Sequence, residues 1–113
     1  MTDYAEVDIE LGGKKFRATL NVRGDYVLSM RIALSGGLPD NTKAIFERLR
    51  TSAWNDSDVI DPIRCGLMGA GNHNHKAILD ECVFGRPLAE SAPQALKIVA
   101  AYLYGLSLES SAA

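Results

Sequence analysis

The side chains best suited to chemistry lie between residues 73 and 82, where two histidines precede an aspartate and a cysteine. His73 and His75 offer imidazole nitrogens to a zinc ion, and Asp80 and Cys82 are the nearest further ligands. A lone His-x-His pair also recurs in ordinary loops, and the remaining ligands would have to come from distant turns. The pattern therefore favours an exposed loop before a helix over residues 76–84, and we expect no metal site.

A thiol-based active site is the second chemistry to weigh. Cys82 would lie near His75 along one helix, and a neighbouring base is what activates a nucleophilic cysteine. However, Cys82 falls at an apolar position of that helix, where a thiol usually serves as packing. The chain also lacks a Gly-x-Ser-x-Gly elbow, a His-Glu-x-x-His motif, a Cys-x-x-Cys pair and a dinucleotide-binding glycine turn. We expect no catalytic residue, no cofactor and no enzymatic activity; a small metal- or thiol-dependent enzyme is the remote alternative.

Composition excludes several classes of partner. The 113 residues are 47% hydrophobic and 23% charged, as in an ordinary soluble domain. A net charge of −2, a pI of about 5.6 and scattered basic residues argue against nucleic-acid binding. No apolar run approaches the roughly 20 residues of a membrane span, and the acidic start does not resemble a signal peptide. We therefore expect a cytoplasmic protein with no membrane contact, in which Cys65 and Cys82 are reduced and buried.

The first 22 residues predict a β-hairpin with an assignable register. Apolar and polar residues alternate over 5–11 and again over 14–22, the period of a half-buried strand. Gly12-Gly13 suits a two-residue type I′ or II′ turn and sets Leu11 opposite Lys14. An isolated hairpin is marginal in water, so its apolar face needs a cover. The register pairs Ile9 with Phe16, Val7 with Ala18 and Ala5 with Leu20 on the apolar face, and Glu10 with Lys15 and Asp8 with Arg17 on the polar face.

Beyond Val22 the period lengthens to about 3.6 residues, which indicates helices. Helices are expected after Asp25, over 42–50, after Asn55–Asp58, over 76–84, and between Ser91 and Gly105. The fold class is therefore α+β, with an N-terminal β-hairpin packed against a bundle of four or five short α-helices. We expect one domain over residues 1–106, with the hairpin in 5–22 and the helical part in 25–105, followed by a flexible tail over 107–113.

Details of two helices carry further predictions. In the helix after Asn55–Asp58, capping by Ser57 lets Pro62 bend the helix, whereas capping by Asp61 places Pro62 at the favoured first position. Glycines 66, 69 and 71 either admit a neighbouring backbone or end this helix, and the second interpretation is simpler. Residues 86–89 form a short connector to the last helix. Its apolar stripe is Leu96, Val99, Ala100 and Leu103, and its solvent face carries Gln94 and Lys97.

Three segments resemble the small tail protein of gene transfer agents and its relatives in tailed phages and prophages. They are Phe16–Leu20, the stretch from Asp58–Ile60 to Cys65–Gly71, and Arg86–Leu88 leading into Ala95–Gly105. The resemblance covers roughly residues 5–105 and rests on glycine and apolar spacings. Members of this family are described as phage tail tube proteins or as tail assembly chaperones. The resemblance implies a non-enzymatic part in building a phage-like tail.

The resemblance also implies partners. Common tail tube subunits are β-rich sandwiches that pair strands around a ring, whereas this sequence predicts two strands and mostly helices. By analogy with the family, a chaperone would cover an apolar helix of the tape measure protein, either in the bacterial cytoplasm or as part of a phage-like particle. The alternative is a structural tail tube or tail-completion subunit, a homo-oligomer that binds other tail proteins through the free edges of its hairpin.

The chaperone hypothesis predicts helix-in-groove binding by large side chains near element ends. The candidate partner-binding residues are Trp54, Met68, Tyr102 and Tyr104. For Trp54, in the loop 51–55, a lid over the core is the competing interpretation, because one tryptophan often seals a small domain.

Overall fold

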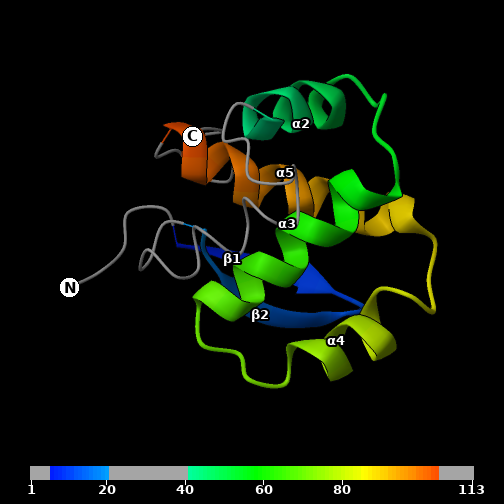
Figure 1. The fold of residues 1–113 in the computed structure, drawn as a ribbon. Helices are drawn as coiled ribbons and strands as arrows, with labels where there is room; N and C mark the ends of the chain where they lie inside the picture. The colour runs from blue at the N-terminus through cyan, green and yellow to red at the C-terminus, as the bar shows by residue number, and fades with distance from the viewer. Residues whose placement is uncertain (1–5, 21–40, 105–113) are drawn as a thin grey trace.

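The computed structural model describes residues 6–20 and 41–104, coloured in Figure 1. This part of the chain contains two strands and four helices, which confirms the α+β class. The elements are β1 (Val7–Leu11), β2 (Lys14–Ala18), α2 (Asn41–Arg50), α3 (Asp56–Gly69), α4 (His75–Cys82) and α5 (Leu88–Tyr104). The helix expected after Asp25, the partner Ala5 and the tail over 107–113 lie outside the described residues, and the domain limits stay a prediction.

The hairpin has the register that the sequence predicts. Ile9 pairs with Phe16 and Asp8 with Arg17 in an antiparallel two-stranded sheet. The glycines between the strands have φ values of +59° and +83°, as a type I′ turn requires at both central positions. Across the polar face, Arg17 Nε lies 3.1 Å from Asp8 Oδ1, and the same guanidinium also binds Glu6. The alternation of the sequence and the turn chemistry thus agree on one pairing.

Two helices cover the apolar face of the hairpin. Helix α5 packs along β1 and helix α3 along β2, while α2 lies on the side of α5 away from the hairpin (Figure 1). The apolar face of the hairpin is largely buried under them, with Ile9 and Leu11 each 1% exposed and Phe16 half-buried. Helix α4 lies beside α3 and beneath the hairpin turn, where the main chain of Cys82 approaches Gly12. Helix α5 is therefore the central element, in contact with α2, α3 and β1.

Helix α3 begins within the Asn55–Asp58 stretch that the sequence marks as a helix start. Its N-cap is Asn55, whose Oδ1 accepts a hydrogen bond of 3.0 Å from Asp58 N–H, while Asp58 Oδ2 accepts one of 3.1 Å from Asn55 N–H. This reciprocal capping box satisfies two donors at once, and caps at Ser57 or Asp61 are wrong. The helix continues through buried Pro62, which has no N–H to donate to the preceding turn.

Gly66 marks the closest approach between α3 and its neighbours. The Gly66 C=O accepts a hydrogen bond of 3.0 Å from Thr19 N–H, just after β2. A Cβ atom added at Gly66 would lie 3.2 Å from Ala18 Cβ and 3.2 Å from two carbon atoms of Ile98. Strand β2, α3 and α5 thus meet at a residue with no side chain. The interpretation that Gly66 ends the helix is wrong, because the helix runs on to Gly69.

Helix α5 also differs from its prediction. It begins at Leu88, so that residues 88 and 89 belong to the helix and not to a connector. An ion pair of 2.9 Å between Arg86 and Glu90 lies at this start. The buried face is built mainly from small residues, and the predicted stripe residues Leu96 and Leu103 are only half-buried. Small side chains let α2, α3 and β1 all approach the same helix. The fully or nearly buried positions are Ser91, Ala92, Ala95, Ile98, Val99, Ala100 and Ala101.

Candidate functional site

An apolar groove opens between the C-terminal end of α2 and the first half of α5. Its volume is about 420 Å³, and its lining is formed by Leu49, Ser52, Trp54, Ala89, Ala92, Pro93 and Leu96. The four α5 residues in this list follow the i, i+3, i+4, i+7 spacing of one helix face. Trp54 and Leu96 are half-buried and pack against the core from the groove side. The groove therefore offers an apolar surface to a ligand of similar character.

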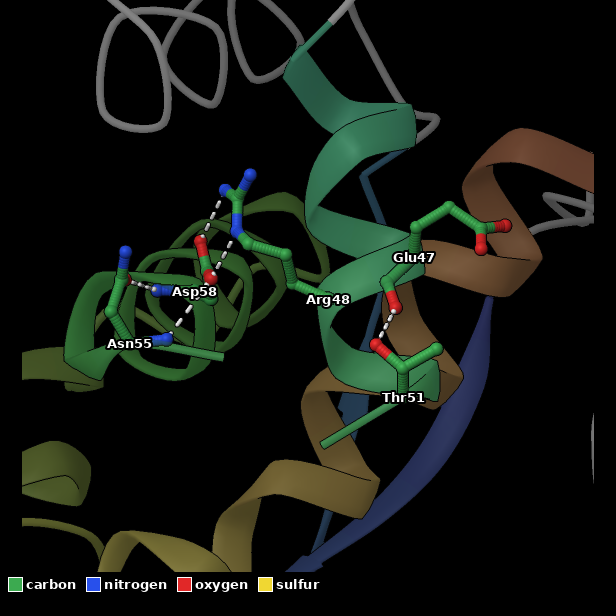
Figure 2. A network of polar contacts seen from close by, with 5 residues as sticks. All are labelled: Glu47, Arg48, Thr51, Asn55 and Asp58. Atoms are coloured by element: carbon green, nitrogen blue, oxygen red, sulfur yellow. Dashed lines mark hydrogen bonds and ion pairs between the residues drawn. The ribbon is translucent and has the colours of Figure 1, made fainter. Parts of the chain in front are cut away.

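The position of Trp54 follows from the way α2 ends. Ala53 N–H donates a hydrogen bond of 2.8 Å to Arg48 C=O. Thr51 Oγ1 donates one of 2.8 Å to Glu47 C=O (Figure 2). Ser52 takes a left-handed conformation with φ of +62°, which reverses the chain. Asn55 then caps α3 one residue after the tryptophan. Trp54 is thus held between two hydrogen-bonded helix ends.

A partly buried ion pair joins those two helix ends. Arg48 donates two hydrogen bonds to Asp58, of 2.7 Å from Nε to Oδ2 and 2.8 Å from Nη2 to Oδ1 (Figure 2). The Asp58 side chain is 3% exposed and that of Arg48 is 39% exposed. Burial alone raises the pKa of Asp58, but the Arg48 hydrogen bonds and the Asn55 N–H outweigh it, so the pKa lies below its usual range. Arg48 and Asp58 therefore fix the end of α2 against the start of α3, beside the groove.

The outer edges of the hairpin are occupied by side chains from the helical part. On β1, Glu10 N–H donates a hydrogen bond of 2.9 Å to Gln94 Oε1, and Lys97 Nζ lies 3.4 Å from Asp8 C=O. On β2, Arg17 C=O accepts a hydrogen bond of 2.9 Å from the side-chain amide of Asn72. A strand edge normally exposes main-chain N–H and C=O groups that can pair with a strand of another chain. These contacts leave fewer of those groups available for such pairing.

The four candidate residues from the sequence do not form one cluster. Trp54 lines the groove, whereas Met68 is half-buried in the last turn of α3, 12 residues after the helix starts at Asp56 and about 18 Å from that start along the helix axis. Tyr102 is half-buried against the core, and Tyr104, 47% exposed, packs edge-to-face on Phe46 of α2 with ring centroids 5.3 Å apart. Trp54 and Tyr104 thus lie toward opposite ends of the α2–α5 contact.

The cysteines and histidines do not assemble into a reactive centre. Cys65 and Cys82 are free thiols, 2% and 4% exposed, as the sequence predicts. Burial raises the pKa of the Cys65 thiol to about 11, which leaves almost no thiolate at neutral pH. His73 is exposed and His75 lies in the first turn of α4. Over residues 6–20 and 41–104, no three His, Cys, Asp or Glu side chains converge as a metal site would require.

The groove partners of Trp54 could not be found from the sequence. Leu49 has a clear apolar period, but Ala89, Ala92 and Pro93 are small residues in a segment that the sequence presents as a connector and a helix start. The i, i+3, i+4, i+7 spacing of Ala89, Ala92, Pro93 and Leu96 would have indicated a shared helix face. This spacing can be recognised only when the helix is known to begin at Leu88.

Comparison with known proteins places the chain in a family. None of the helices in the described part of the chain has the length and apolarity needed to cross a membrane. A search of curated proteins and a search of solved structures each gave no match. A family model described as phage tail tube protein, GTA-gp10, matches residues 5–105. Because this match spans most of the 113 residues, the chain belongs to the phage tail tube protein family GTA-gp10, whose members are proteins of phage-like tails.

Proposed function

We propose that this protein is a tail assembly chaperone that binds an apolar helical segment of the tape measure protein in the groove beside Trp54. The proposal rests on the apolar stripe of Ala89, Ala92, Pro93 and Leu96, which lines an open groove. The buried face of α5 further along the helix, from Ala95 to Ala101, packs against other elements instead. Amphipathic helices bind such grooves through residues at i, i+3, i+4 and i+7. Family membership supplies the context of tail assembly.

Trp54 is the proposed anchor of this contact. Tryptophan is enriched among residues that dominate binding energy, and Trp54 lies in the groove with part of its ring accessible. Tyr104 extends the proposed surface, because Leu96 and Tyr104 are eight residues apart on α5, about 12 Å along its axis. A bound helix of three turns spans that distance. We place Tyr102 and Met68 at the periphery of the proposed binding surface.

The strand edges support a chaperone over a ring-forming subunit. Tube subunits of the common type join through strands, and here Gln94, Lys97 and Asn72 already bond three main-chain groups on the outer edges. The second candidate function, a structural tail tube or tail-completion subunit, is favoured by the description of the family as a tail tube protein. In either role the protein acts in the bacterial cytoplasm during assembly and binds other tail proteins.

Co-expression with the tape measure protein of the same tail gene cluster tests the proposal. Trp54→Ala is expected to weaken the complex by roughly 30-fold, which corresponds to the loss of about 2 kcal/mol at an interface hot spot. The measurement is co-purification followed by titration calorimetry. The control is Phe84→Ala, because Phe84 is 53% exposed and does not line the groove.

A second variant separates binding from stability, because Trp54 also packs on the core. Ala89→Glu places a carboxylate on the groove wall at an exposed helical position, where glutamate has a good helix propensity. It should abolish the complex without changing the thermal unfolding midpoint. If Ala89→Glu and Trp54→Ala both bind the tape measure protein as tightly as the wild type, the groove is not the binding site.

A further inference from the structure

One residue of the groove has an unusual backbone conformation. Ser52 has a φ of +62°, and within residues 6–20 and 41–104 it is the one residue other than glycine with a positive φ. A left-handed backbone suits glycine, because the Cβ atom of any other residue crowds the following carbonyl oxygen there. Ser52 therefore holds a conformation that a glycine would adopt at lower cost.

The hydrogen bonds at the end of α2 require this conformation. Ala53 N–H donates to Arg48 C=O at 2.8 Å, and the N–H of Ser52 itself donates to Leu49 C=O at 3.4 Å. These two bonds form the Schellman motif that ends many helices, and Ser52 occupies the position that is usually glycine. The motif uses only main-chain groups. The end of α2 therefore gives no structural reason for a side chain at residue 52.

Ser52 brings a hydroxyl group to the groove. The residue is exposed, and among the described residues that line the groove it is the one with a hydroxyl. Within the described part of the chain, no hydrogen bond engages this hydroxyl. Binding grooves are mostly apolar and carry a few polar groups that fix the orientation of the ligand. Residues in sparsely populated backbone conformations also cluster at binding sites. Both properties of Ser52 thus favour a role in binding.

An amphipathic helix offers one kind of group to this hydroxyl. The main-chain N–H and C=O groups inside a helix already bond one another. The polar side chains that border the apolar stripe of the helix are not used in this way. When the apolar stripe lies against Trp54 and Leu96, a bordering polar side chain is the group that can reach the Ser52 hydroxyl.

We propose that Ser52 is a specificity-determining residue of the groove, whose hydroxyl bonds a polar side chain at the border of the apolar stripe of the bound helix. This inference rests on the proposed function, because it assigns a role within the same groove. The hydroxyl sets the register of the helix, and the apolar contacts supply most of the affinity. A helix with no polar side chain at that place leaves the desolvated hydroxyl without a partner, which lowers affinity.

The test is Ser52→Gly in the full chain, because glycine relieves the backbone strain and removes the hydroxyl together. The thermal unfolding midpoint should rise by about 2–4 °C. Affinity for the tape measure protein should fall roughly 5-fold, as expected for the loss of one hydrogen bond. Scanning calorimetry and titration calorimetry measure the two effects. A residue that serves only to end α2 would not lose affinity while stability rises, so a Ser52→Gly variant that binds as tightly as the wild type overturns the proposal.

A second substitution separates the hydroxyl from the freedom of the backbone. Ser52→Ala keeps the Cβ atom and its strain, so stability should not rise, but affinity should fall by the same factor of roughly 5. Ser57→Ala is the control and should bind as the wild type does, because Ser57 is exposed in the first turn of α3 and does not line the groove.

The same titrations distinguish this inference from the proposed function. If the wild-type chain forms no complex with the tape measure protein, the proposed function is wrong and the role of Ser52 is wrong with it. If the wild-type chain forms the complex, and both Ser52→Ala and Ser52→Gly bind as tightly, only the role of Ser52 is contradicted.

Discussion

Replacing Arg48 by alanine is expected to lower the free energy of unfolding by about 2–4 kcal/mol. The substitution leaves the carboxylate of Asp58, which is 3% exposed, without its charged partner. Removal of one member of a buried pair costs about 3–5 kcal/mol, and the value is lower here because the Arg48 side chain is 39% exposed. Urea unfolding at neutral pH measures the change.

Arg50→Ala is the matched control on the same helix. Arg50 binds Glu47 three residues away, and both side chains are about half exposed. Such an exposed pair contributes little to stability, because solvent screens the two charges. The double variant Arg48→Ala, Asp58→Asn, which removes the stranded charge, should recover part of the loss. Equal effects of Arg48→Ala and Arg50→Ala would show that the Arg48–Asp58 pair does not join α2 to α3.

The effect of Arg48→Ala should also depend on pH. The pKa of Asp58 is lower in the folded chain than its ordinary value of 3.8, so the ionised form stabilises the fold. This contribution is fully present above about pH 5 and is lost as the pH falls through the lowered pKa. The difference between wild type and Arg48→Ala should therefore shrink on acidification. The pKa of Asp61 is raised, mainly by burial, so ionisation of Asp61 lowers stability as the pH rises. Asp61 is present in both proteins, so it does not account for the difference between them.

Gly66→Val is expected to lower the free energy of unfolding by about 3 kcal/mol or more. A Cβ atom at this position lies 3.2 Å from atoms of Ala18 and Ile98, so the added side chain must push α3 away from β2 and α5. Overpacking of a buried contact costs about 1–3 kcal/mol and occasionally more, and the branched side chain also loses rotamers in a helix. Denaturant unfolding followed by circular dichroism measures the loss.

Gly85→Val is the control for this substitution. A Cβ atom at Gly85 has no heavy atom within 4 Å, so the change should stay within about 0.5 kcal/mol of the wild type. If Gly66→Val is as stable as Gly85→Val, then α3 does not approach the hairpin as closely as described, and the packing of the hairpin under α3 must be reconsidered.

The hairpin was predictable because several independent signals agree on it. The alternation of two segments, the Gly12-Gly13 turn and the charge pairs all specify one register, and the register is confirmed. The start of α3 was not predictable, because Asn55, Ser57 and Asp61 are all good caps and only the hydrogen bonds distinguish them. Gly66 was misjudged for a similar reason, since a glycine at a close approach and one at a helix end look the same in sequence.

The candidate site was predictable only in part. Trp54 stands out as the single tryptophan in a loop, and the structure places it in a groove. The role of Gln94 and Lys97 was missed, because both were assigned to the solvent face of the last helix. They are half-buried against β1, a tertiary contact between residues more than 80 positions apart in the chain. Hydrophobic periodicity carries no information about such a contact.

We infer that this tail protein keeps its strand edges closed and works by binding an apolar helix. Sedimentation velocity of the purified wild-type chain, alone and with the tape measure protein, tests it most directly. We expect one small species that does not grow with concentration when the chain is alone, and a defined soluble complex when the tape measure protein is present. Rings or tubes formed by the wild-type chain alone, with no complex in the mixture, would show that the protein is a tube subunit and not a chaperone.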